Sequence, residues 1–184
     1  MGTSSEHNVL YNYQVANASN VYMALIQTET PYYQSNPDAS TPFTSQVAFA
    51  DPVFTGGALN NKAWGLRVID SEDIFVYGAG LYSFFENYDQ KCVPLQNCQG
   101  KPDTISFLAQ HQTQRQKLTD LLLDNMVDIK NSGKVHLYGL STKAAVNQVT
   151  VEGKSAALDK DNRNNFCAAI ALFEVQDSSP TKCK

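Results

Sequence analysis

The sequence predicts an all-β fold in which short strands recur along the chain. Residues 15–23, 68–78 and 129–139 share one pattern: an apolar residue, five mostly small or polar residues, and then an apolar–x–apolar strand. The period-2 alternation of a strand sends one set of side chains inward and the other outward. The inward set is Val21, Met23, Ile74, Val76, Val135 and Leu137, and the outward set is Tyr22, Phe75 and His136.

Two architectures are compatible with this recurring unit. One coil of a parallel β-helix consists of a strand, a polar turn and another strand, and it must stack on a neighbour to bury its apolar face. A β-sandwich also has short strands separated by turn signals. The pattern alone favours neither architecture.

The units are separated by long insertions, at residues 34–57 and 90–103, and such loops inside a compact domain usually carry function. The run at residues 113–125 fits either a short helix or a strand next to a turn. A polar loop at 159–165 precedes a last strand expected at 168–175. We expect one domain over residues 1–176 and a tail at 177–184.

Composition excludes several classes of protein. A hydrophobic fraction of 42% in 184 residues is enough to build one core. A net charge of −4 gives no attraction to nucleic acid or to an anionic membrane. No run of about 18 apolar residues occurs, so no transmembrane helix is expected. Residues 1–7 lack the basic and apolar regions of a signal peptide, which suggests a short non-native extension or a longer precursor.

The four cysteines suggest an oxidising compartment. Cys92 and Cys98 flank a short proline-containing loop, and we expect a disulfide between them. Cys167 and Cys183 remain as a second pair that could clamp the tail. Free, buried thiols are the alternative, because sequence does not fix connectivity.

Two other kinds of site can be judged from spacing. The three histidines are scattered and show no ligand spacing around the cysteines, so no metal site is expected. Asn17, followed by Ala18 and Ser19, is an acceptor for N-glycosylation and suits an exposed turn.

A candidate catalytic acid lies at the end of an apolar alternating run. Glu29 is followed closely by a proline and by Tyr32 and Tyr33. A carboxylic acid among aromatic rings is favoured in its protonated form, and the rings can stack on the C–H faces of sugars. The alternative is a strand that runs into a Pro-Tyr turn with a solvated glutamate.

A family resemblance is carried by QTETPYYQ at residues 27–34, AWGLRV at 63–68 and VYGAGLYSFFENY at 76–88, followed by Cys92 and Cys98. Together these segments closely resemble the C-terminal part of fungal β-1,3-glucanases of glycoside hydrolase family 55. The likeness extends from about residue 6 to about residue 173. It implies a right-handed parallel β-helix of the pectate-lyase-like kind with long inserted loops.

The same resemblance implies a function. It implies a secreted, extracellular fungal chain that acts on β-1,3-glucan by exo-type hydrolysis with inversion, with no metal or organic cofactor. Glu29 takes the place of the general acid, and Glu6 would lie on an adjacent coil and help to order the attacking water. The alternative for Glu6 is a solvated residue near a chain end. Glu86 is the second candidate for the acid.

Aromatic residues in the resembling segments are candidate sugar platforms: Tyr32, Tyr33, Trp64, Tyr82 and Tyr88. Ordinary packing is the alternative for each of them, and it is preferred for Phe84 and Phe85.

The main departure from the family is length. The enzymes that the chain resembles are much longer, with two β-helical halves and a cleft between them. This chain resembles only the end of the second half. The alternative function is therefore a non-catalytic β-helix that binds β-1,3-glucan or docks on a partner, either an N-terminal half or another chain. A structural β-helix without a ligand is a third possibility.

Overall fold

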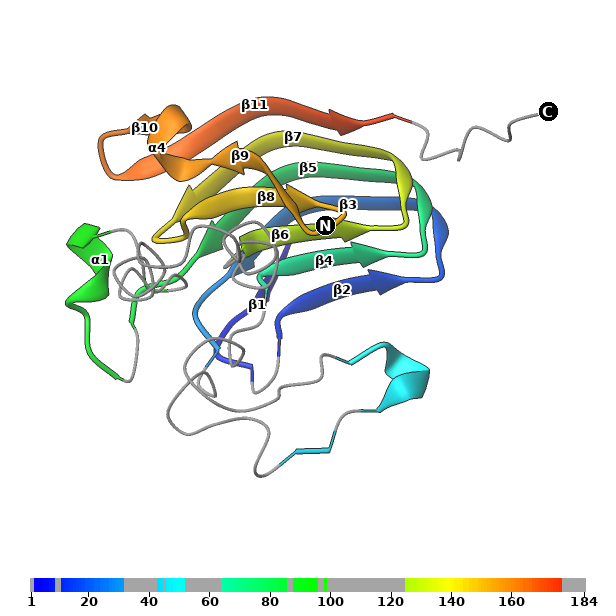
Figure 1. The fold of residues 1–184 in the computed structure, drawn as a ribbon, viewed down its shortest axis with the longest axis horizontal. Helices are drawn as coiled ribbons and strands as arrows, with labels where there is room; N and C mark the ends of the chain where they lie inside the picture. The colour runs from blue at the N-terminus through cyan, green and yellow to red at the C-terminus, as the bar shows by residue number, and fades with distance from the viewer. Residues whose placement is uncertain are drawn as a thin grey trace, which may run out of the picture.

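The computed structural model describes residues 2–8, 11–31, 43–44, 46–51, 64–85, 88–95, 98 and 125–176. Two sheets lie against each other around one core (Figure 1). The six-stranded sheet has the order β1-β3-β5-β7-β11-β10, and the five-stranded sheet has the order β2-β4-β6-β8-β9. In the described part of the chain, no helix is long and apolar enough to cross a membrane.

The strands of the six-stranded sheet are β1 (Thr3–Ser5), β3 (Ser19–Thr28), β5 (Glu72–Tyr82), β7 (Gly133–Lys143), β11 (Cys167–Val175) and β10 (Arg163–Asn164). Those of the five-stranded sheet are β2 (Tyr13–Ala16), β4 (Leu66–Ile69), β6 (Asn125–Lys130), β8 (Asn147–Val151) and β9 (Lys154–Leu158). The short helices are η1 (Val47–Phe49), α1 (Cys92–Leu95) and α4 (Asp159–Asn162).

The three repeats found in the sequence are three stacked coils. In the five-stranded sheet, Val68 pairs with Val15 on one side and with Ile129 on the other. In the six-stranded sheet, β5 pairs with β3 and with β7, and all of these pairs are parallel. The structure is therefore all-β with parallel sheets, as a β-helix requires.

The six side chains predicted to point inward are buried to different extents, according to the place of their coil in the stack. Ile74, Val76 and Val135 are fully buried, and Leu137 is 1% exposed. Val21 and Met23 pack against the same core but are only partly buried. They belong to the outermost coil described, where residues 19–25 of β3 are paired only with β5.

The turn between the two sheets explains the five polar residues of each repeat. Asn17, Asp70 and Asn131 occupy equivalent places and have φ values of 51°, 49° and 45°. Asn and Asp tolerate this left-handed region better than other non-glycine residues. Each turn thus reverses the chain at the same place, which keeps successive coils in register.

A second column of left-handed residues bends the six-stranded sheet. Gly78 and Gly139 have φ values of 71° and 66°, and Leu25 lies alongside Gly78 with a φ of 53°. A Cβ added to Gly78 would lie 3.2 Å from the Leu25 Cδ2 atom. Glycine therefore serves here for close packing at a bend.

The C-terminal end of the stack is antiparallel. β11 pairs antiparallel with β7, and β9 pairs antiparallel with β8. The expected polar loop at 159–165 contains α4 and β10, and it is stabilised by an ion pair between Asp159 and Arg163. These strands cover the last parallel edges, which would otherwise offer unpaired backbone groups.

The predicted bridge between Cys92 and Cys98 is present. Both cysteines are buried, and they pack with Ala144 in a small cluster separate from the main core. Cys167 is partly buried at the start of β11. Cys183 and the run 113–124 lie outside the described residues.

Removing this bridge is expected to lower the free energy of unfolding. Closing a loop with a sequence separation of six residues restricts the unfolded chain by roughly 2 kcal/mol. The double variant Cys92→Ser/Cys98→Ser should show that loss in urea unfolding, and wild-type protein kept in a reducing agent should match it. Equal stability of the oxidised and reduced proteins would contradict the prediction.

Candidate active site

Glu29 directly follows β3, at the edge where the six-stranded sheet ends. Its side chain is 28% exposed, and its Oε2 atom lies 3.1 Å from Nε2 of His7. Its backbone carbonyl accepts a hydrogen bond of 2.9 Å from the Asn12 side chain. The carboxyl group is therefore half-buried and held by a titratable neighbour, while its backbone is tied to the chain before β2.

Glu6 lies on the neighbouring strand end. The register of β1 on β3 runs through Ser5 opposite Thr28, so the next residues in line are Glu6 and Glu29. Glu6 Oε1 accepts hydrogen bonds from the Gln27 Nε2 atom at 2.8 Å and from the Ser4 hydroxyl. Parallel pairing thus brings the two predicted carboxylates to one edge of the sheet, on adjacent strands.

A buried hydroxyl pair fastens the strand ends behind Glu29. The Thr30 Oγ1 and Ser83 Oγ atoms are 3.0 Å apart, and both residues are fully buried. The Phe84 backbone N–H donates to Thr30 Oγ1 at 2.6 Å. Since a buried hydroxyl without a partner is costly, this network fixes β3 against the segment after β5. The backbone that follows the candidate acid is thereby positioned in advance.

Aromatic rings extend from the acid toward solvent. The His7 ring is 6.0 Å from the Phe85 ring, and Phe85 stacks on Tyr88 at 5.9 Å. Tyr88 is 60% exposed. Tyr88 therefore presents ring surface to solvent, separated from Glu29 by the His7 and Phe85 rings.

The other predicted platform residues differ in placement. Tyr82 is partly buried, packs on Phe84 at 5.8 Å, and lies over Gly80, where a Cβ would meet its hydroxyl at 2.6 Å. Tyr32, Tyr33 and Glu86 lie outside the described residues.

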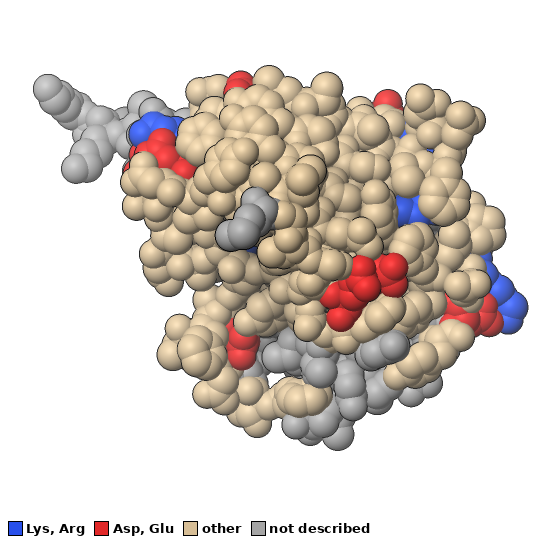
Figure 2. Space-filling view, turned by 180° about the vertical axis from the view of Figure 1, so that it is seen from behind, with Lys and Arg blue, Asp and Glu red and all other residues tan. Residues whose placement is uncertain are grey.

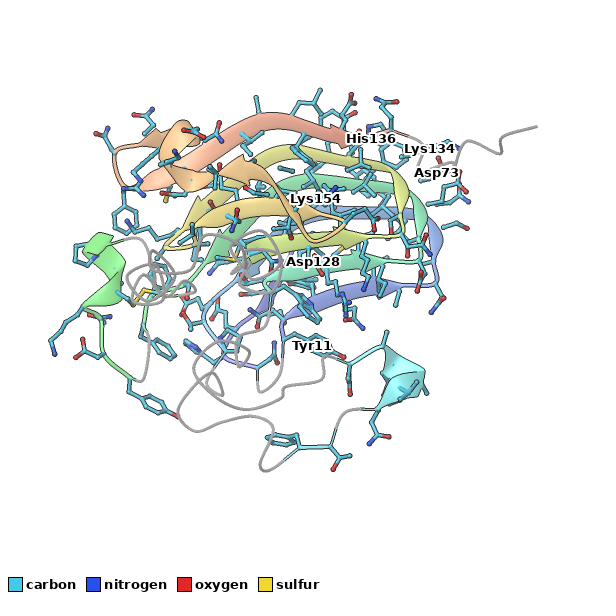
Figure 3. All side chains as sticks on the ribbon, in the orientation of Figure 1. Tyr11, Asp73, Asp128, Lys134, His136 and Lys154 are labelled. Atoms are coloured by element: carbon cyan, nitrogen blue, oxygen red, sulfur yellow. A yellow bond between two sulfur atoms is a disulfide. The ribbon has the colours of Figure 1, made fainter. Side chains whose placement is uncertain are left out.

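Trp64 has little surface to offer a sugar in this structure. It is 7% exposed, its ring stacks on Tyr11 at 5.6 Å, and the Arg67 guanidinium lies 4.4 Å from the ring centroid. Arg67 also contacts the buried Asp128 carboxyl at 3.3 Å, and burial raises the pKa of Asp128. Tyr11 and Asp128 both lie at the five-stranded sheet (Figure 3). Trp64 thus packs the five-stranded sheet instead of joining the exposed rings.

The Tyr11 hydroxyl links the five-stranded sheet to the loop that carries η1. It donates to Asp51 at 2.7 Å, and burial followed by this hydrogen bond raises its pKa to about 12 from the ordinary 10.0. Since the folded pKa lies above the unfolded one, the stabilisation is present below pH 10 and is lost as the pH rises through about 12.

Tyr11→Phe should therefore flatten this alkaline loss and lower stability at pH 8 by about 1 kcal/mol. Urea unfolding at pH 8 and pH 11 measures both effects, with the exposed Tyr22→Phe as the matched control. The same pH dependence in wild type and Tyr11→Phe would show that the hydrogen bond has no such role.

Two residues of this site were not singled out from the sequence. His7 and Asn12 reach Glu29 only because β1 and the chain before β2 lie beside the end of β3. A histidine directly after Glu6 is the one signal that could have pointed to the pair.

The surface charge and the possible metal-binding side chains indicate which other kinds of ligand the described residues could bind. On the face opposite to that of Figure 1, one compact group of acidic side chains stands out, with other acidic and basic side chains scattered around it (Figure 2). Within the described ranges, no group of three or more His, Cys, Asp or Glu side chains could hold a metal ion. Asn17, the predicted glycosylation acceptor, is exposed in its turn.

No family model matches the sequence. A protein of Arthroderma benhamiae named as a probable glucan endo-1,3-beta-glucosidase is 49% identical over 174 residues, which are 94% of this chain and 17% of that protein. A glucan 1,3-beta-glucosidase of Cochliobolus carbonum is 34% identical over 92% of this chain and 19% of its own length.

A non-secreted LysM effector of Penicillium expansum, LysM15, is 32% identical over 98% of the chain and 10% of its own length. The chain spans a fifth or less of the length of these relatives. The resemblance predicted from the sequence is thereby confirmed: this chain is related to a segment of fungal β-1,3-glucosidases.

Proposed function

We propose that the group around Glu29 is the acid-bearing part of a site that hydrolyses β-1,3-glucan. The observation that carries the proposal is the half-buried Glu29 carboxyl, which His7 holds at the end of β3; the Phe85 ring lies next to His7, and the exposed Tyr88 ring stacks beyond it. Hydrolysis of a glycoside needs a positioned acid for the leaving oxygen, and exposed rings stack on sugar faces.

The residues have distinct roles in this proposal. Glu29 donates its proton to the glycosidic oxygen, and Glu6, on the adjacent strand end, helps to order the water that attacks the sugar carbon from the opposite face. Tyr88, Tyr82 and the tyrosines at 32 and 33 supply ring surface. No cofactor takes part in these roles.

Finer properties of the family belong to the proposal as well. We assign to the chain a right-handed parallel β-helix of glycoside hydrolase family 55, exo-type attack, inversion, and an extracellular location. The parallel coils support the first of these, and the buried Cys92–Cys98 bridge supports an oxidising compartment. The names of two relatives support the substrate.

A second candidate function is docking on a further β-helical segment that completes the site. Three observations favour it: Val21 and Met23 are only partly buried, Leu25 is 70% exposed, and an apolar pocket beside β3 is lined by Thr3, Tyr22, Met23, Ala24 and Ile26. A preceding coil of the same kind would pair with residues 19–25 and cover these side chains. In this case the chain binds glucan but turns it over only with that segment present.

Product analysis on laminari-oligosaccharides tests the proposal. We expect glucose to be released from one chain end and to appear first as the α-anomer in proton NMR, because inversion of a β-glucoside gives that anomer. Internal cleavage products would refute exo-type attack, and β-glucose would refute inversion. Binding without any product would favour the second candidate.

A further inference from the structure

His7 occupies an unusual backbone position between two contacts. It follows β1 with a φ of 53°, a left-handed value that is uncommon for a residue with a side chain. Its ring bridges Glu29, at 3.1 Å from Nε2, and the Thr30 backbone carbonyl, at 2.9 Å from Nδ1. One histidine therefore contacts two consecutive residues at the end of β3.

The Thr30 contact decides where the ring carries a proton. A carbonyl oxygen can only accept a hydrogen bond, so Nδ1 must be the donor. Nε2 then has two options toward Glu29: a charged ring donates to the carboxylate, or a neutral ring accepts from the protonated carboxyl. Either way, one proton lies between Nε2 and Oε2. If that proton is lost, two lone pairs face each other at 3.1 Å.

The described residues around the pair come from three segments. The end of β1 contributes Glu6, whose Oε1 is already bound by Ser4 and Gln27. The segment after β5 contributes the Phe85 ring, with the titratable Tyr88 stacked beyond it, and the chain before β2 contributes the uncharged Asn12. The His7 side chain is 31% exposed, so solvent can exchange protons with its ring.

From this geometry we infer that His7 is a positioning residue that returns the catalytic proton to Glu29. This inference rests on the proposed function. When the glycosidic bond breaks, the leaving oxygen takes the proton of Glu29 and leaves a carboxylate. The pair has then lost its one shared proton, and the neutral His7 ring takes up a proton from solvent at Nε2. Transfer of this proton to the Glu29 carboxylate restores the acid and leaves the ring neutral, so the proton balance closes.

The pH profile separates this role from a merely structural one. In His7→Gln the amide can still donate to Glu29 but has no proton to transfer. We expect kcat to fall by about 10-fold and the basic limb of its pH profile to change, with KM little changed. Added imidazole should restore part of kcat in His7→Ala, because the site is open to solvent.

An NMR measurement gives a readout that does not need turnover. In wild type, Nδ1 should stay protonated across the titration. The Nε2 signal should change in Glu29→Gln, which removes the carboxylate that shares a proton with that nitrogen.

The outcomes distinguish the two claims. Full activity of Glu29→Gln would overturn the proposed function and this inference together. An inactive Glu29→Gln beside an unshifted His7→Gln profile would overturn only the role of His7. An unprotonated Nδ1, or an Nε2 signal that ignores Glu29→Gln, would overturn it independently of activity.

Discussion

Glu29→Gln is expected to lower the rate of glucose release from laminari-oligosaccharides by about 10²–10⁴-fold. Glutamine keeps the shape of the side chain and can still meet Nε2 of His7, but it has no proton to give to the leaving oxygen. Binding of the oligosaccharide should survive, because the rings that flank the acid are unchanged. Steady-state kinetics gives the loss in kcat, and calorimetry gives the affinity.

Glu72→Gln is the matched control for this variant. Glu72 is the first residue of β5, directly after the turn between the two sheets, and it makes an ion pair with Lys134 at 2.6 Å. The same chemical change there should leave the rate unaltered. A Glu29→Gln protein as active as Glu72→Gln would show that another group supplies the proton.

If the wild-type chain shows no turnover, the role of Glu29 has to be tested by a different experiment. If it binds β-1,3-glucan, the N-terminal part of a longer relative can be added in trans. Turnover that returns with wild type but not with Glu29→Gln would show a site shared between two segments. Binding without any such rescue would leave glucan binding as the function.

The repeats and their register could be predicted because they depend on local patterns. Apolar–x–apolar pairs mark inward positions such as Ile74 and Val135, and Asn17, Asp70 and Asn131 mark the left-handed turn. These features recur at equivalent places, so three copies reinforce one another. The direction of β11 could not be predicted, because a single strand has the same alternation whether its neighbour is parallel or antiparallel.

The candidate site was predictable only in part, because some of its contacts depend on neighbouring strands and not on local patterns. Glu29 is recognisable from its own segment, whereas its contact with His7 depends on how the end of β1 lies beside β3. Trp64 shows the same limit, because its burial results from Tyr11 and Arg67, which come from the segment before β2 and from β4. The contacts and burial of a side chain at a strand end depend more on the neighbouring coils than on the sequence around that side chain.

Ile74→Ala is expected to cause one of the largest losses of stability in this chain, about 2–5 kcal/mol. Ile74 is fully buried in the middle coil, between Val21 of β3 and Val135 of β7. Truncation there removes apolar area and leaves a cavity between two sheets that cannot both collapse onto it. Urea unfolding should show a lower midpoint with an unchanged m value.

Val135→Ala and Val21→Ala make the same chemical change at equivalent places in the neighbouring coils. Val135 is fully buried, and its loss should cost about 2 kcal/mol, whereas the partly buried Val21 should cost less than about 1 kcal/mol. Equal losses for Val135→Ala and Val21→Ala would contradict the stacked-coil account. A loss at Val21 that grows with protein concentration would instead show that another copy covers the open coil, because association adds its free energy only when the interface is populated.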